Sequence, residues 1–356
     1  MANRVLIDLS PLRESRGFRL LFTGQLVAVF GSQLAAVAVP FQVYSLSRSS
    51  LQVGLVSMAQ LVPLIAGALI GGSLGDALDR RVILGVTPVA LALTSAALAA
   101  NAAVTHPSLA VVYVVSAAAA GLGGVMSTAG AAAVPALVGP GHLVAAYSAV
   151  QVVDQVGTVA GPALAGVLIT AVHLPTVYAL TGVIYLPTAV TAAWVPAIPP
   201  APGASRPGLG SVIEGLRFLR GRQVLQGVYL IDINAMVFGM PRALFPALAV
   251  SVFHGGASTL GNLYAAPAAG ALAGALTTGW LAGIRRQARA VVVAVCVWGA
   301  AVAAFGLVHV LWAALILLAV AGWADVISAV LRATILQMSV ADEFRSRISS
   351  VQIAVV

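Results

Sequence analysis

The chain has 356 residues, of which 60% are hydrophobic and only 8% are charged. Soluble globular domains carry roughly 25% charged residues, so this composition excludes a soluble domain and predicts a polytopic membrane protein. The formal net charge of +8 does not indicate a nucleic-acid-binding protein, because the arginines occur in short clusters between apolar stretches and not on a basic surface interleaved with aromatic residues.

Apolar runs long enough to cross a bilayer recur along the whole chain. A helix needs about 20 apolar residues to span the hydrocarbon core, and runs of this length predict an all-α integral membrane protein. The predicted spans are 18–44, 51–75, 82–102, 109–134, 144–172, 174–195, 224–250, 259–283, 290–309 and 311–337. An eleventh span opens at Ile348 and continues to the last residue, Val356.

The placement of arginine predicts which ends of the spans face the cytoplasm, because cytoplasmic loops are enriched in basic residues. With a cytoplasmic amino terminus, Arg48 is the one arginine that falls in an outer loop. The inner segments then carry Arg4, Arg13, Arg16, Arg19, Arg80, Arg81, Arg206, Arg217, Arg220, Arg222, Arg285, Arg286, Arg289, Arg345 and Arg347. We therefore expect a multi-pass protein whose amino terminus is cytoplasmic.

A short charged hairpin, residues 72–81, separates the second and third predicted spans. A carboxylate at Asp76, near the end of a helix, can cap a neighbouring helix or pair with an arginine, and so hold the cytoplasmic mouth shut in one state. An exposed ion pair contributes about 1 kcal/mol to stability, which is weak enough for the pair to form in one state and break in another. The predicted gating residues are Gly72, Asp76, Asp79, Arg80 and Arg81. The alternative is that Asp79, Arg80 and Arg81 only mark a cytoplasmic turn.

Small residues recur in the fifth predicted span, at Gly157, Gly161, Pro162 and Gly166. Glycines at this spacing remove side chains from one face of a helix, and Pro162 removes a backbone hydrogen bond. We expect this helix to bend and to pack tightly where it meets the other half of the protein. The alternative is a small-residue packing face with no bearing on the direction of transport.

The longest hydrophilic segment, 196–208, is rich in proline and glycine, which is typical of a linker. The residues that follow, 211–220, place apolar side chains on one helical face and predict a surface helix on the cytoplasmic interface. The expected organisation is a six-helix bundle over 1–195, a linker over 196–222 and a second set of helices over 223–356. This is the plan of a transporter with two similar halves.

Charged side chains inside predicted spans are a further signal, because each costs about 2.5 to 3.5 kcal/mol on insertion scales and normally faces a cavity or a partner. These residues are Asp154, Asp232, Arg242, Asp325 and Arg332. Asp325 and Arg332 lie on nearly one helix face, about 10 Å apart along the axis, so direct or water-bridged pairing is expected.

The remaining charges inside spans are candidates for proton or substrate binding. Asp154 and Asp232 fall close to the membrane midplane, where an aspartate can load and release a proton. Arg242 follows a helix-breaking proline, where an anionic ligand can meet its guanidinium. The alternative for each is a satisfied interhelical hydrogen bond, and for Asp325 with Arg332 a purely structural pair.

The sequence contains neither a phosphate-binding Gly-Lys-Ser/Thr loop nor a nucleophile motif. Its histidines sit at predicted loop ends without the spacing of metal ligands. These observations argue against an ATP-driven pump, an enzyme, a cofactor and a metal site.

The hairpin after the second span resembles a signature of the major facilitator superfamily, in which a glycine is followed by an aspartate and then by a basic pair. The matching residues are Gly72, Asp76, Arg80 and Arg81. Ala77 stands in place of a usual arginine, and Asp79 in place of a usual glycine. An acid at the position of Asp79 resembles the branch of siderophore (enterobactin) exporters and multidrug efflux proteins.

Other stretches resemble the same branch, among them 39–43, 135–139, 242–248 and 345–348, so that the resemblance covers nearly the whole chain. The small-residue pattern over 157–166 resembles the signature of the superfamily's exporters that exchange substrate for protons. One departure concerns the fourth span, 109–134, which has no arginine although many proton-coupled exporters carry one there, so the coupling residue is left open.

This resemblance implies a major facilitator fold of two six-helix bundles, the second incomplete because two of the usual twelve helices are missing from the chain. It implies a secondary active transporter of the bacterial inner membrane that exports a small amphipathic molecule, siderophore or drug-like, by proton antiport and alternating access. Its partners would be the substrate, protons and the lipid bilayer, with no nucleic acid. The alternatives are an importer with the same fold and a non-transporting sensor or truncated remnant.

Overall fold

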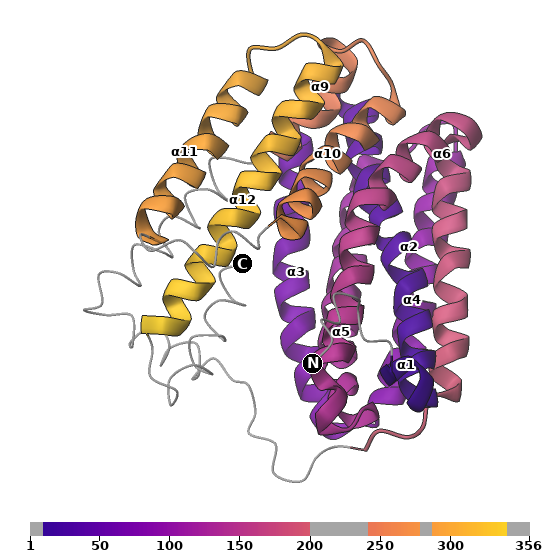
Figure 1. Cartoon of the computed structure of the whole chain (residues 1–356). Coiled ribbons are helices and arrows are strands. Elements are labelled where there is room, and N and C mark those ends of the chain that lie inside the picture. Colours follow the sequence, from indigo (N-terminus) through magenta and orange to yellow (C-terminus); the bar gives the residue numbers. More distant parts are fainter. Residues whose placement is uncertain (1–9, 200–240, 278–286, 340–356) are drawn as a thin grey trace. The chain divides into compact units, whose positions relative to one another are not determined.

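The computed structural model describes residues 10–199, 241–277 and 287–339, and the regular elements among them are all helices. These residues form two compact units. Unit 1 contains residues 10–199 and 246–262, and unit 2 contains residues 241–245, 263–277 and 287–339. Figure 1 shows the helices of both units, coloured along the sequence.

Unit 1 opens with the short helix α1 (Ser10–Glu14), which precedes the first predicted span. The next four helices match the first four predicted spans. They are α2 (Arg16–Ser47), α3 (Ser50–Ala77), α4 (Arg80–Ala103) and α5 (Leu109–Leu137). The helices α2 to α5 begin and end within a few residues of the predicted bounds, because an apolar run of bilayer length satisfies its own backbone hydrogen bonds only as a helix. Ser15 caps α2, where its hydroxyl accepts a hydrogen bond from the Phe18 amide at 3.1 Å.

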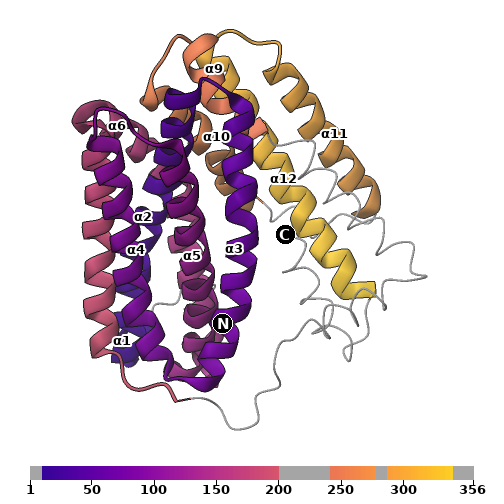
Figure 2. The same ribbon diagram turned by 180° about the vertical axis from the view of Figure 1, so that it is seen from behind.

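The next helix, α6 (Leu143–Trp194), follows the short 3-10 helix η1 (Pro140–His142) and contains both the fifth and the sixth predicted spans. Its backbone is non-helical at His173, where φ is 64° and ψ is 159°. The chain reverses direction there, so α6 is two antiparallel segments that meet at His173 (Figure 1). Both α2 and α4 pack against α6, and α3 runs beside α5 (Figures 1 and 2).

Unit 2 contains helices near the last three complete predicted spans. They are α10 (Ala257–Leu276), of which residues 257–262 belong to unit 1, together with α11 (Gln287–Phe305) and α12 (Leu311–Ser339). The helices α11 and α12 lie side by side (Figures 1 and 2).

The described end of the predicted span 224–250 is not a continuous α-helix. It consists of the 3-10 helix η2 (Pro241–Leu244) and the short helix α9 (Phe245–Ser251). Two prolines, Pro241 and Pro246, lack the backbone N–H that a regular helix needs, which accounts for the interruption.

Several expectations concern residues outside the described ranges. These include residues 224–240 with Asp232, and most of the predicted linker with its surface helix at 211–220. The predicted boundaries after residues 195 and 222 therefore stay a prediction.

Close glycine contacts join pairs of helices in both units. In unit 1 a Cβ atom on Gly67 of α3 would overlap the carbonyl oxygen of Gly121 in α5. In unit 2 a Cβ atom on Gly270 of α10 would overlap the carbonyl oxygen of Ala319 in α12. Helices in lipid associate through such close backbone approach, because no hydrophobic drive exists between them. Both units thus contain a helix pair that is held at close backbone contact by a glycine.

The length and composition of these helices fit a bilayer. Seven helices in the described ranges are long and apolar enough to cross a membrane, namely α2, α3, α4, α5, α6, α11 and α12. The segment Ala145–Trp194 of α6 has 50 residues, about twice the number that one span requires, and supplies two passes. The chain is an all-α integral membrane protein.

One end of unit 1, called here the arginine end, is formed by α1, the start of α2, the α3–α4 turn and the end of α6. It carries Arg13, Arg16, Arg19, Arg80 and Arg81.

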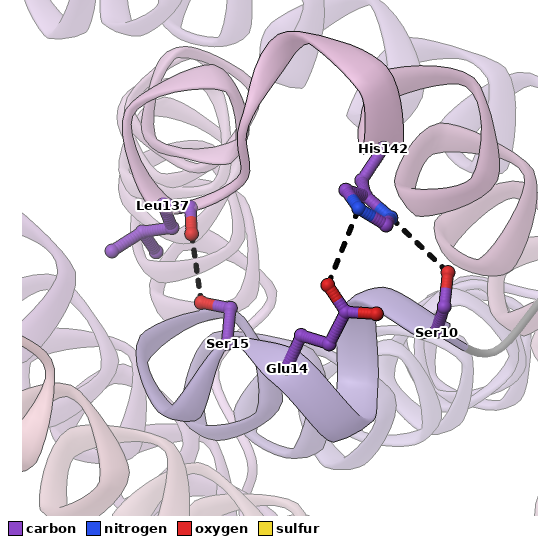
Figure 3. Close-up of polar contacts among 5 residues, drawn as sticks. All are labelled: Ser10, Glu14, Ser15, Leu137 and His142. Carbon is purple, nitrogen blue, oxygen red and sulfur yellow. Dashed lines mark hydrogen bonds and ion pairs between the residues drawn. The ribbon is translucent and has the colours of Figure 1, made fainter.

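Polar contacts at the arginine end fasten α1 to the turn between α5 and α6 (Figure 3). The Ser15 hydroxyl donates to the Leu137 carbonyl at 2.7 Å. A Glu14 carboxylate oxygen lies 3.3 Å from His142 Nε2, and the Ser10 hydroxyl lies 3.1 Å from His142 Nδ1. The sequence placed His142 at a loop end without assigning it a partner, because residues this far apart share no sequence pattern.

Candidate transport and gating sites

The predicted gating hairpin forms the turn between α3 and α4 at the arginine end. Asp79 occupies the N-cap position of α4, where its Oδ1 accepts hydrogen bonds from the amides of Arg81 and Ile198, each at 2.9 Å. The Arg80 amide donates to the Ile198 carbonyl at 3.2 Å. Asp79 therefore fastens the segment that leaves α6 to the first turn of α4, a contact that the sequence did not indicate.

The two arginines of the hairpin reach other helices of unit 1. The Arg80 guanidinium donates to the Ala132 carbonyl in α5 at 3.4 Å. The Arg81 guanidinium donates to the Ala193 carbonyl in the last turn of α6, where the final carbonyls lack partners within the helix and a cation is favoured. Both arginines therefore tie the start of α4 to neighbouring helices.

The other predicted gating residues lie on the last turns of α3. Asp76 belongs to the final turn of this helix, and its side chain lies outside the described part of the chain. A Cβ atom on Gly72 would meet nothing within 4 Å among the described residues. The gating role of the hairpin therefore stays a prediction.

Two glycines of the 157–166 pattern form the surface on which α2 packs. A Cβ atom on Gly157 would overlap the side chain of Val29, and one on Gly161 would lie 2.9 Å from Gln33 Cγ. Neither site has room for a methyl group at the present helix separation, so the absence of side chains here is what allows α2 and α6 to approach.

The other half of the pattern faces the start of α10, within unit 1. A Cβ atom on Gly166 would lie 2.9 Å from Ser258 Cα and 3.1 Å from Gly261 Cα. A Cβ atom on Gly261 would in turn overlap the Pro162 carbonyl oxygen. Residues 157–166 therefore contact helices on two sides, namely α2 and the start of α10.

Asp154 lies on α6 one turn before Thr158. The Thr158 hydroxyl donates to the backbone carbonyl of Asp154 at 2.8 Å and accepts from Gln33 Nε2 at 3.3 Å. Gly157 lies beside Val29 of α2, and Gln25 and Asp154 each lie about one turn before these residues, so Gln25 is at about the level of Asp154. Gln25 Oε1 is buried without a hydrogen-bond partner among the described residues. Asp154 is half-buried, and no basic side chain of the described ranges pairs with its carboxylate.

In unit 2 the structure brings three predicted charges into one electrostatic cluster. Arg332 of α12 and Arg242 of η2 both lie close enough to the Asp325 carboxylate to interact with it electrostatically. Arg332 is buried, Asp325 is half-buried and Arg242 is exposed. Asp325 and Arg332 lie on the same helix, and their predicted pairing stays a prediction. Arg242 belongs to a different element, so its approach to Asp325 is a result of tertiary structure.

An aromatic cluster begins at Tyr264, next to Arg242. The Tyr264 hydroxyl donates to the Arg242 carbonyl at 3.2 Å. The ring of Phe245 lies edge-on to Tyr264 at a centroid distance of 5.2 Å and to Phe305 at 6.1 Å. A flat guanidinium beside aromatic rings can bind an anionic group on an amphipathic molecule.

Several polar residues of these sites went unnoticed in the sequence. Gln25, Gln33 and Thr158 are uncharged, and Tyr264 lies in an alanine-rich span, so none of them produced a signal of charge or spacing. The available signal was the eight-residue interval between Gln25 and Gln33, about two helical turns, which places them on one helix face.

The family model of the Major Facilitator Superfamily matches residues 21–356. The chain belongs to the Major Facilitator Superfamily. The match covers both units and agrees with the resemblance found in the 72–81 hairpin. The fold is therefore that of a membrane transporter.

Curated relatives extend the comparison along nearly the whole chain. The enterobactin exporter EntS of Citrobacter koseri is 31% identical over 344 residues, which cover 97% of this chain and 82% of the relative. EntS of Escherichia coli O81 is 29% identical with the same coverage.

Solved structures agree on the fold. A bacterial homologue of the human lysosomal transporter Spinster, in an inward-facing conformation, matches with a TM-score of 0.68 and 16% identity over 95% of this chain and 77% of its own. A bacterial homologue of the iron transporter ferroportin, also inward-facing, matches with a TM-score of 0.66 and 17% identity over 96% of this chain and 88% of its own. At these identities the likeness concerns the fold alone.

Proposed function

We propose that this chain is a secondary active exporter that moves a small amphipathic molecule, siderophore-like or drug-like, outward in exchange for protons. The observation that carries the proposal is the similarity along 97% of the chain to curated enterobactin exporters. The charged cluster of unit 2 supports it, since charges inside membrane spans mark substrate and ion pathways.

The substrate is assigned to the unit 2 cluster. Arg332 is buried on the same helix as Asp325 and lies close enough to interact with its carboxylate. Arg242 is exposed and lies next to Tyr264, whose hydroxyl bonds the Arg242 backbone carbonyl. The N–H groups of its guanidinium can donate hydrogen bonds to a ligand. An anionic or phenolic oxygen of the substrate binds the Arg242 guanidinium, while the apolar part of the molecule packs on the neighbouring rings.

Proton exchange is assigned to Asp154. Two arginines act on Asp325, whereas no basic side chain of the described ranges acts on Asp154. A carboxyl without a counter-ion inside the membrane is stable in its neutral form and carries a charge only when the cavity admits water. This makes Asp154 suited to gain a proton on one side of the membrane and to lose it on the other.

Alternating access of the two bundles couples these events. The 72–81 hairpin gates the cytoplasmic side, and Asp76 is the gating carboxylate. The close contacts of residues 157–166 with two helices support a role for this segment in the same rearrangement. The arginine-rich segments support a cytoplasmic amino terminus, and the bacterial relatives support a location in the inner membrane.

Inside-out membrane vesicles test the proposal. Vesicles that contain the protein should accumulate enterobactin, the molecule named for the relatives, when a proton gradient is present, and an uncoupler should abolish the accumulation. Uptake that persists with the uncoupler would rule out proton coupling. Accumulation only in right-side-out vesicles would identify an importer, and no transport in either orientation would favour a sensor.

Two asparagine variants separate the assigned roles. Asp154→Asn should lose gradient-driven uptake but keep substrate exchange between the two sides, because the binding site is intact. The matched control Asp325→Asn should retain the response to the uncoupler and raise the KM for transport, because it alters the arginine cluster. If Asp154→Asn still accumulates substrate in an uncoupler-sensitive manner, another group carries the proton.

A further inference from the structure

A hollow of about 490 Å³ opens at the arginine end of unit 1. It is lined by Arg16, Arg81, Ala193, Trp194, Val195 and Pro196. These residues come from the first turn of α2, the first turn of α4 and the end of α6, and none of them is acidic. None belongs to the charged cluster of unit 2 or to the surroundings of Asp154.

Both arginines of the hollow are exposed. Arg16 is the first residue of α2, and the glycine that follows it lies against Pro196, since a Cβ atom on Gly17 would come within 3.0 Å of Pro196 Cδ. Arg81 is held by its bond to the Ala193 carbonyl and retains further N–H groups for a ligand. The chain therefore presents two guanidinium groups beside one hollow.

Trp194 supplies a third, different feature of the hollow. Its side chain is the last of α6 and is 66% exposed. Because α2, α4 and α6 span the membrane, their ends lie where hydrocarbon gives way to headgroups, and tryptophan prefers this level. An exposed indole here faces the glycerol and upper acyl region of lipid, while the arginines lie at headgroup height.

We propose that this hollow is a binding site for the headgroup of an anionic phospholipid. The two guanidinium groups bind the phosphate oxygens, and Trp194 packs against the glycerol and the first carbons of the acyl chains. Basic pockets between helix ends recognise anionic headgroups in this way. The site does not depend on the transported substrate.

Native mass spectrometry of the purified protein with added lipids tests the proposal. The probes are phosphatidylglycerol and phosphatidylcholine with the same acyl chains, so that only the headgroup differs. Wild-type protein should retain phosphatidylglycerol preferentially. Arg16→Gln should weaken that retention about fivefold, the loss expected for one arginine near an anionic surface, and Trp194→Ala should weaken retention of the same lipid.

Arg19→Gln is the matched control. Arg19 is exposed one turn along α2, donates to the Leu12 carbonyl at 3.4 Å and does not line the hollow. Its loss should leave retention of phosphatidylglycerol unchanged. Equal losses in Arg16→Gln and Arg19→Gln would show diffuse surface charge instead of a site.

Two results with wild-type protein would also overturn the proposal, which keeps it testable if Arg16→Gln fails to insert. One is equal retention of phosphatidylglycerol and phosphatidylcholine. The other is displacement of the retained lipid by inorganic phosphate at millimolar concentration, which would identify a site for a free anion. Because the measurement involves no transport, its outcome is separate from that of the vesicle assay.

Discussion

Replacement of Gly124 by alanine tests whether close backbone contact holds α3 against α5. A Cβ atom at this position would lie 2.7 Å from the amide nitrogen of Ala68 and 3.2 Å from the carbonyl carbon of Gly67, and would overlap the carbonyl oxygen of Leu64. Ordinary carbon contacts begin at about 3.5 Å, so the helices must part by roughly 1 Å. All the obstructing atoms are backbone atoms, so no rotamer change can relieve the clash.

The neighbouring glycine provides the control within the same helix. A Cβ atom on Gly123 would meet nothing within 4 Å among the described residues. Overpacking costs about 1–3 kcal/mol, whereas alanine in place of glycine in an open helix position gains up to about 1 kcal/mol from helix propensity. Because both positions lie within α5, the propensity gain applies to both variants, and the free energies of unfolding of Gly124→Ala and Gly123→Ala should differ by the overpacking cost of about 1–3 kcal/mol.

Reversible unfolding by sodium dodecyl sulfate in mixed micelles, followed by circular dichroism, measures this difference. Gly124→Ala should unfold at lower detergent fraction than wild type, and Gly123→Ala at the same or a higher one. Equal midpoints for the two variants would refute the conclusion that these helices are held by backbone contact at Gly124.

Three further substitutions test individual contacts. Tyr178→Phe removes the 2.9 Å hydrogen bond to Gln42 Oε1 and leaves the Gln42 side chain, which is 2% exposed, without that donor. The free energy of unfolding should therefore fall by about 1–3 kcal/mol. The double variant with Gln42→Leu should recover most of this loss, and a double variant as unstable as the single one would contradict the reasoning. Asp79→Ala should lose about 1 kcal/mol or more in the same titration because it removes the cap of α4, whereas Asp79→Asn keeps an acceptor and should lose less; identical losses would mean that the cap contributes nothing. Asp76→Asn should slow vesicle uptake at an unchanged amount of protein in the membrane, and unaltered uptake would reduce the hairpin to a marker of topology.

The sequence allowed the spans to be predicted closely but not the partners of their charged residues. The bounds of α2, α3, α4 and α5 lie within a few residues of the apolar runs, and the junction between the fifth and sixth spans falls at His173, where the backbone leaves the helical conformation. The described part of the seventh span was the exception, since η2 and α9 interrupt it. Pro241 and Pro246 weaken the helix locally. A hydropathy average over about 20 residues is hardly changed by two prolines, so it still predicts one continuous span.

The sequence by itself determined that the chain lies in a membrane, where α2 to α5 begin and end, and which residues are charged inside the predicted spans. It could do so because each helix in lipid satisfies its own backbone hydrogen bonds, so hydropathy over one segment decides that segment's structure.

Only the tertiary structure decided what those residues touch. It placed Asp79 on the Ile198 amide, Arg242 beside Asp325 and Trp194 beside Arg16. Each pair joins residues far apart in the chain, and such pairing depends on which helix faces approach. That approach is set by glycine contacts and caps between helices, which a reading of one segment at a time does not contain.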